Sequence, residues 1–274
     1  MIKLGINYTS YKAHPMTAEK FIDLHAELKM DTIDWHTGAF KGMDKKELLR
    51  LKNKALMKGL PMGYMGQGGS FLRVTTTPDP QIQMCKDAID LSAFLGIPVI
   101  RTFGALPPPG WTVDQTFEGL AKGLREAAEY GAEKGVMVAL QNHNHGNIAS
   151  KADAIIRILK EANHPNVGYI LDTGQWANTI GDQGHVDKFD PTVDLYGYIE
   201  KVLPYTCWVR AKIYEVASGT EKALDYDRIY GILKKGKYNG SVSLVYEGYE
   251  KDDRTELVTK AAKHLRAMQA KHGL

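Results

Sequence analysis

Short apolar runs alternate with longer amphipathic stretches along the whole chain. The apolar runs have the length of strands that are buried on both faces, as in a parallel sheet. They predict eight strands, over residues 3–8, 31–35, 60–65, 97–103, 136–140, 167–172, 207–213 and 242–247.

Helix-start signals precede several of the amphipathic stretches. Thr17 and Ser150 are suitable N-cap residues, Asp44 with Glu47 can form a capping box, and Pro80 suits a first helical turn. With the spacing of the apolar residues, these signals predict eight helices, over residues 17–29, 44–58, 80–95, 113–134, 150–162, 191–202, 225–235 and 254–271.

Eight β–α units in sequence predict one (β/α)₈ TIM barrel domain over residues 1–274, in preference to an open doubly wound sheet. The segments 66–80, 104–111 and 173–191 follow strands and are long and rich in Gly or Pro, whereas the connections at the opposite face are short. We expect them at the mouth of the barrel, either as lids or as tolerated insertions.

Composition narrows the class of protein. A chain that is 43% hydrophobic can bury a large core, and its net charge of +3 is carried by scattered Lys and Arg, which argues against nucleic-acid binding.

Cys85 and Cys207 are isolated in apolar surroundings, as reduced core cysteines are. Neither a signal peptide nor a membrane-spanning run is present in the sequence, so we expect a cytoplasmic protein. The sequence is compatible with a homo-oligomer.

The fifth predicted strand ends in a dense polar cluster, QNHNH, over residues 141–145. Barrels of this class place their chemistry at the carboxyl ends of the strands. The ends of neighbouring strands also carry charged residues, namely Arg101, Asp172, Arg210, Lys212 and Glu247. Each has an ordinary explanation alone, as an ion-pair residue or a turn cap, but together they predict a ligand site.

Five of these strand ends resemble a known family. The segments IPVIRTFG, VALQNHNHG, ILDTGQW, VRAK and YNGSVSLVYEG are similar to the serial strand ends of xylose-isomerase-like barrels, which include sugar and sugar phosphate isomerases and epimerases. The resemblance covers essentially the whole chain. It implies a barrel that binds a small polyol, a divalent metal held by Glu, Asp, His and Glu from strands five to eight, and proton transfer by the two Glu.

When the family's metal-ligand positions are matched to this chain, most of the ligands are replaced by other residues. The four ligand positions match Gln141, Asp172, Arg210 and Val245, so that only Asp172 is retained. Arg has no lone pair to give and Val has no polar atom, whereas divalent metals require anionic or imidazole ligands. The sequence therefore favours no metal and leaves the cofactor open. A position that often contacts substrate in the family matches Gln175.

The replacements suggest that the Arg210 guanidinium takes the space of the metal and pairs with Asp172. The result is either a catalytically silent core or a site in which Arg210 stabilises an enediolate oxygen. Proton transfer then falls to His143 and Glu247, which lie two residues beyond Gln141 and Val245 with the same strand parity. The alternative is that His143 packs among loop ends and Glu247 pairs with a lysine.

Charge and aromatic residues suggest the ligand. Arg101, Arg210, Lys212 and His143 bias the mouth toward positive charge, so we expect a small polyhydroxylated ligand that is anionic, a sugar acid or sugar phosphate. Its hydroxyls would bond to Gln141, Asn142 and Gln175, and its anionic end would meet Arg101 or Lys212. Trp176 and Trp111 offer faces that stack on sugar rings. Two functions remain open, a metal-independent isomerase, epimerase or lyase and a non-catalytic carbohydrate-binding barrel or complex subunit.

Overall fold

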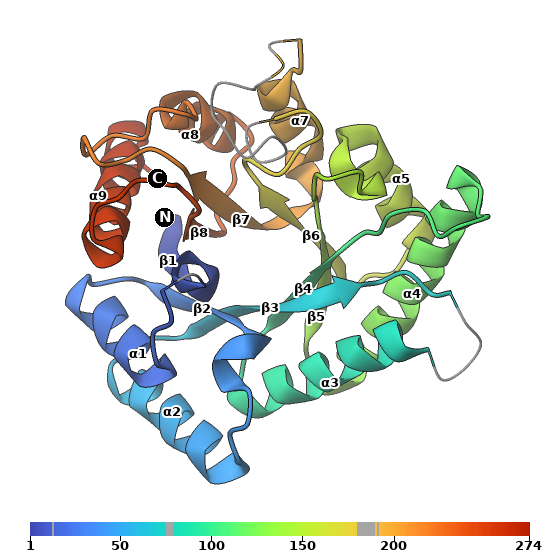
Figure 1. Cartoon of the computed structure of the whole chain (residues 1–274), viewed down its shortest axis with the longest axis horizontal. Coiled ribbons are helices and arrows are strands. Elements are labelled where there is room, and N and C mark those ends of the chain that lie inside the picture. Colours follow the sequence, from blue (N-terminus) through green and yellow to red (C-terminus); the bar gives the residue numbers. More distant parts are fainter. Residues whose placement is uncertain (13, 75–78, 180–189, 191) are drawn as a thin grey trace.

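The computed structural model describes residues 1–12, 14–74, 79–179, 190 and 192–274. Eight parallel strands close into one barrel in chain order (Figure 1), which confirms the predicted (β/α)₈ fold. The strands are β1 (Lys3–Asn7), β2 (Thr32–His36), β3 (Met62–Ser70), β4 (Val99–Phe103), β5 (Met137–Gln141), β6 (Val167–Asp172), β7 (Thr206–Ile213) and β8 (Ser241–Tyr246).

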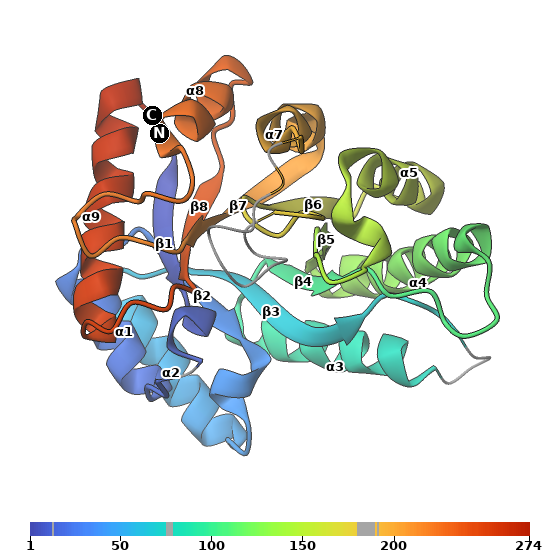
Figure 2. The same cartoon turned by 45° about the horizontal axis from the view of Figure 1, so that its top comes forward.

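The helices surround the barrel on the outside (Figures 1 and 2). They are α1 (Ala18–Glu27), α2 (Lys45–Met57), α3 (Pro80–Leu95), α4 (Val113–Lys134), α5 (Ala152–Ala162), α7 (Leu195–Val202), α8 (Tyr226–Lys235) and α9 (Arg254–His272). No helix in the described part of the chain is both long and apolar enough to cross a membrane.

Side-chain caps explain where most of these helices begin. Thr17 accepts a hydrogen bond from the Lys20 N–H, and Asp44 and Glu47 form the predicted capping box. The predicted cap at Ser150 is wrong, because residues 148–150 form a separate turn and α5 begins after Lys151 without a side-chain cap. Asp194 caps α7, and the predicted start of this helix, residue 191, lies outside the described residues.

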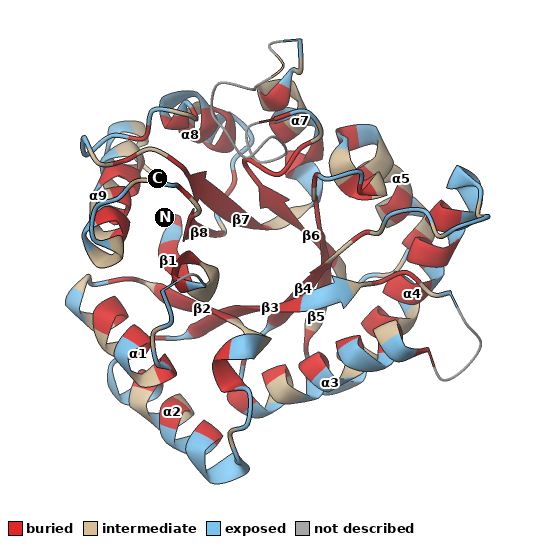
Figure 3. Cartoon of the chain, in the orientation of Figure 1, coloured by how far each residue is buried: buried red, intermediate tan, exposed pale blue. Residues whose placement is uncertain are grey.

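The core has two parts, and Figure 3 shows that the strands are almost wholly buried. The larger part lies between the barrel and the helices. The smaller part is a cluster on the opposite strand face, which we call the barrel floor, and it consists of Tyr64, Val99, Ala139, Ile170 and Trp208. The next side chains on the same face of four of these strands are polar, namely Arg101, Gln141, Asp172 and Arg210. The floor therefore supports a polar layer above it.

His25 is a fully buried titratable group of the outer core. Its Nδ1 lies 2.8 Å from the Phe21 carbonyl oxygen and its Nε2 lies 3.1 Å from that of Ile6. Burial lowers the pKa of His25 from 6.5 to about 4. The folded chain therefore stays neutral at His25 in a pH range where the unfolded chain binds a proton.

We expect the free energy of unfolding to fall as the pH drops from about 6.5 toward 4, because the unfolded state binds more protons there. At pH 5 the share of His25 amounts to roughly 2 kcal/mol. Urea unfolding at pH 7 and pH 5 measures the difference, which should shrink in His25→Gln and persist in the exposed control His14→Gln. An unchanged difference in His25→Gln would contradict this assignment.

Candidate active site

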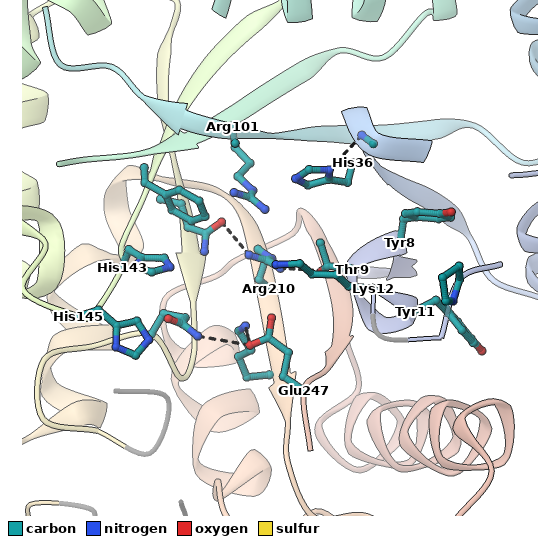
Figure 4. A pocket seen from close by; sticks show the side chains of 17 residues that line it. Tyr8, Thr9, Tyr11, Lys12, His36, Arg101, His143, His145, Arg210 and Glu247 are labelled. Atoms are coloured by element: carbon teal, nitrogen blue, oxygen red, sulfur yellow. Dashed lines mark hydrogen bonds and ion pairs between the residues drawn. The ribbon is translucent and has the colours of Figure 1, made fainter. Parts of the chain in front are cut away.

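A cavity of about 650 Å³ opens at the carboxyl ends of the strands (Figure 4). A cavity of this size suits a small-molecule ligand. Seven of the predicted site residues line it, namely Arg101, Gln141, His143, Gln175, Arg210, Lys212 and Glu247.

Asp172 lies fully buried at the base of the cavity and is held by three side chains. Gln141 Nε2 donates to its Oδ2 at 3.1 Å, Arg210 Nη1 lies 3.4 Å from the same oxygen, and Lys212 Nζ lies 3.8 Å away. Burial raises the pKa of Asp172, and the positive charges of Lys212 and Arg210 oppose that rise. The predicted contact between Asp172 and Arg210 is thus confirmed.

Arg210 is fixed by neighbours on both sides. Its Nη1 donates to Gln141 Oε1 at 2.9 Å, and its Nη2 donates to Thr9 Oγ1 at 3.1 Å. Thr9 belongs to the turn that follows β1, so the guanidinium ties three strands of the barrel together. With only 2% of its surface exposed, Arg210 is a rigid positive group at the base of the cavity.

Lys212 and Glu247 form an ion pair on the β7–β8 side of the cavity. Burial alone would raise the pKa of Glu247, but the ammonium of Lys212 and the guanidinium of Arg210 outweigh it and hold that pKa at about 2. Glu247 is therefore ionised near neutral pH and has no proton to donate. The structure places Glu247 at the site but supports the alternative, a carboxylate paired with a lysine, over a catalytic acid.

His143 is neutral, and its surroundings fix its tautomer. Its Nδ1 lies 3.2 Å from the Asn144 carbonyl oxygen, which can only accept, so the ring proton is on Nδ1 and Nε2 carries a lone pair. The ring packs edge-to-face on Phe103, with 4.3 Å between the centroids. Burial lowers the pKa of His143 to about 4. Figure 4 shows the ring at the side of the cavity, near His145, with Arg210 toward the centre.

His36 is a site residue that the sequence prediction missed. Its Nδ1 accepts a hydrogen bond from the Gly38 N–H at 3.1 Å, so the neutral ring carries its proton on Nε2. Burial, followed by the charge of Arg101, lowers the pKa of His36 to about 4. His36 and His143 therefore have opposite tautomers, one a donor and the other an acceptor. The signal was available, because His36 is the polar end of an otherwise buried strand.

A family model described as a xylose isomerase-like TIM barrel matches residues 22–268 of the chain. The protein belongs to the xylose isomerase-like TIM barrel family. No curated protein matches the sequence significantly.

Solved structures with the same fold include three enzymes of different named activity. D-psicose 3-epimerase with D-tagatose, from Clostridium cellulolyticum H10, is 17% identical, with a TM-score of 0.74 over 99% of this chain and 98% of that one. The apo 3-keto-D-glucoside 4-epimerase of E. coli is 16% identical, with a TM-score of 0.74 over 98% of this chain and 100% of that one. A probable 3-DHS dehydratase of Bacillus anthracis is 15% identical, with a TM-score of 0.70 over 97% of this chain and 99% of that one.

The divalent metal that the xylose isomerase-like resemblance implies does not fit the residues present. Asp172 is the one anionic side chain among the four matched positions, and its Oδ2 already faces Gln141, Arg210 and Lys212. The side-chain Oε1 of Gln141 accepts a hydrogen bond from Arg210, and Val245 is apolar and fully buried. A dication at these positions would lie next to the guanidinium of Arg210 and the ammonium of Lys212, and these positive groups already occupy the oxygen atoms that could bind it.

We expect purified protein to contain no stoichiometric Mn, Zn, Co or Mg, as measured by elemental analysis. A matched variant that rebuilds the family's ligand set, Gln141→Glu with Arg210→His and Val245→Glu, should gain a metal. A metal at near full occupancy in the wild type that disappears in Asp172→Asn would contradict the prediction.

Three predicted substrate-binding residues do not line the cavity. Asp172 lies beneath it, as described above. Asn142 is fully buried and uses its amide within the fold, donating to the carbonyl oxygens of Asp172 and Gln175 and accepting from the Tyr169 hydroxyl and the Asp172 N–H. The reason is its place just after β5, since Asn142 follows the inward-facing Gln141, the last residue of that strand, and points to the other face.

The predicted sugar-stacking role of Trp176 is wrong. Its indole is fully buried and packs against Tyr198 of α7, with 5.3 Å between the ring centroids. The loop after β6 therefore turns this side chain outward into the helix layer. Trp111 also lies away from the cavity lining and packs on the outer core.

Proposed function

We propose that this protein is an isomerase or epimerase of a small, polyhydroxylated, anionic sugar derivative and works without a divalent metal. The observation that carries the proposal is the pairing of a neutral His143, whose Nε2 lone pair is free of the Asn144 contact, with the fixed Arg210 guanidinium in one cavity. Family membership and the named activities of the structural neighbours support the reaction class.

In the proposed reaction, His143 Nε2 removes a proton from the carbon next to the substrate carbonyl. The C–H electron pair becomes the second bond between the two carbons, and the carbonyl oxygen takes up the negative charge of an enediolate. Arg210 stabilises that oxygen, which replaces the electrostatic contribution of a metal. Return of the proton from His143 to the neighbouring carbon gives the isomer, with the hydroxyl proton passing from one enediolate oxygen to the other. The epimer forms when the enediolate turns over in the cavity, so that His143 returns the proton to its other face.

Gln141 and Gln175 have separate parts in this proposal. Gln141 uses its amide to orient Arg210 and Asp172, so it positions the guanidinium. Gln175 donates weakly to Glu247, at 3.4 Å, while its buried Oε1 has no partner among the described residues. We assign that oxygen to a substrate hydroxyl, because a buried acceptor without a donor is unfavourable.

Deuterium exchange tests the function directly. Wild-type protein is incubated in D₂O, with EDTA, with ketoses, their phosphates and keto sugar acids, and NMR follows the proton next to the carbonyl. We expect exchange with at least one anionic substrate, followed by formation of its isomer or epimer. Exchange that appears only after a divalent metal is added would contradict the metal-independent mechanism.

The Lys212–Glu247 ion pair favours a second candidate, a carbohydrate-binding barrel without catalysis. The family's two proton-transferring Glu are Gln141 and Val245 here, and Glu247 is ionised and paired. A single base must then both remove and return the proton. Binding of an anionic polyol without any exchange at its carbon would select this candidate.

A further inference from the structure

Arg101 is buried in the cavity wall and has no anionic partner among the residues that the structure describes. Only 2% of its surface is exposed, and among the described residues it forms no ion pair. Its Nε and Nη1 groups have no hydrogen-bond acceptor in the described part of the protein. Arg210 and Lys212, the other buried Arg and Lys of the described chain, differ, since Arg210 contacts Asp172 and Lys212 contacts both Asp172 and Glu247.

The surroundings hold this guanidinium in place without neutralising it. On one side lies Gly66 of β3, where a Cβ atom would come within 2.8 Å of Arg101 Nη2 and 3.0 Å of Nε. On the other side lies the Phe103 ring, whose centroid is 4.6 Å from the Arg101 Cζ. The guanidinium of Arg101 thus occupies the space that a side chain at residue 66 would fill.

Further donors lie beside Arg101. Figure 4 shows its guanidinium pointing into the cavity toward Arg210, with His36 next to it and Lys12 across the opening. The His36 tautomer assigned above presents an N–H at Nε2, so this side of the cavity offers hydrogen-bond donors and positive charge. Two neighbouring buried guanidinium groups, one of them without an anion among the described residues, are unfavourable, and a bound anion would relieve this.

We propose that the oxyanion of the ligand, a carboxylate or a phosphate, binds at Arg101 between Gly66, Phe103 and His36. This inference deepens the proposed function, on which it rests for the polyol part of the ligand. Of the two sequence-based candidates for this role, Arg101 and Lys212, Lys212 is excluded by its contacts with Glu247 and Asp172. The polyol would extend from Arg101 toward Gln175 and His143, which line the same cavity.

Isothermal titration of the full chain with D-glucuronate, D-fructose 6-phosphate and D-fructose tests the subsite. We expect at least one anionic probe to bind at least about tenfold more tightly than D-fructose, and the two anions show whether a carboxylate or a phosphate is preferred. Arg101→Gln should weaken the preferred anion roughly 10- to 100-fold, while binding of D-fructose stays unchanged.

Gly66→Ala is the sharper variant, because it keeps every charge and displaces only the guanidinium. It should lose the anion preference as Arg101→Gln does, and the exposed Arg50→Gln should not. The melting temperature of ligand-free Arg101→Gln should be unchanged or raised, because the variant removes an unpaired buried charge. A clearly lowered melting temperature would indicate a structural Arg101 and overturn the inference.

Wild-type protein without a preference for either anion, or undiminished anion binding in both Arg101→Gln and Gly66→Ala, would also overturn it. The proposed function fails separately. If anion binding depends on Arg101 but no deuterium exchange occurs, the subsite is supported and the isomerase function is contradicted. If deuterium exchange of an anionic substrate is insensitive to Arg101→Gln, the isomerase is supported and the subsite is contradicted.

Discussion

Arg210→Ala is expected to lower the free energy of unfolding by about 3 kcal/mol, toward the lower end of the range for a broken buried ion pair. The variant removes the Nη1 contact to Asp172 at 3.4 Å and leaves that carboxyl buried with Gln141 and the more distant Lys212. Lys212 remains as a partial counter-charge, which is why the effect stays near the lower end. Urea unfolding at neutral pH measures the loss.

Two further variants separate the buried charge from ordinary truncation. Asp172→Asn in the Arg210→Ala background removes the stranded carboxyl and should recover at least about 1 kcal/mol, since a buried neutral amide is less unfavourable than a buried charge. Arg50→Ala breaks an exposed pair with Glu19 and should change stability by less than about 1 kcal/mol. An Arg210→Ala midpoint equal to that of the wild type would contradict the pairing.

His143→Gln is expected to slow deuterium exchange by roughly 10²- to 10⁴-fold, the usual contribution of a general base. Glutamine preserves much of the side chain's polarity but has no basic nitrogen. The exchange rate from NMR provides the measurement, with the exposed His14→Gln as control. Exchange that continues unchanged in His143→Gln would assign the base to another residue.

The pH dependence of kcat/KM gives an independent reading of the same base. His143 must be neutral to accept a proton, and its pKa is about 4. The rate should therefore be level above about pH 5 and fall as the pH drops through 4, because protonation removes the lone pair. A rate that falls below pH 6.5 would show an imidazole with an ordinary pKa.

Much of the fold and part of the site could be predicted because strand alternation sets which side chains face inward. The periodicity that defines the strands also places Arg101, Gln141, Asp172 and Arg210 in one layer above the barrel floor. The same rule could have excluded Asn142, whose parity is opposite to that of Gln141. The resemblance does not point to His36, because the segments that carry it lie on strands four to eight and none lies on β2.

Other features could not be predicted, because no periodicity reaches them. Trp176 lies in an irregular loop, so only the packing of α7 decides that its indole turns away from the cavity. The pairing of Glu247 with Lys212 depends on side-chain positions across two strands. The protonation state of the Glu247 carboxyl depends on the same positions. The tautomers of His36 and His143 depend on one backbone contact each.

Closure of the barrel has a consequence for the order of folding. β1 is the first strand made, yet one of its two partners is β8, with Lys3 opposite Ser241 and Ile6 opposite Leu244. Contacts between such distant parts of a chain form slowly, because the whole intervening segment must be ordered first. A growing chain that has reached only β7 therefore exposes two open strand edges, at β1 and β7, to unwanted pairing. Synthesis of β8 removes both edges in one step.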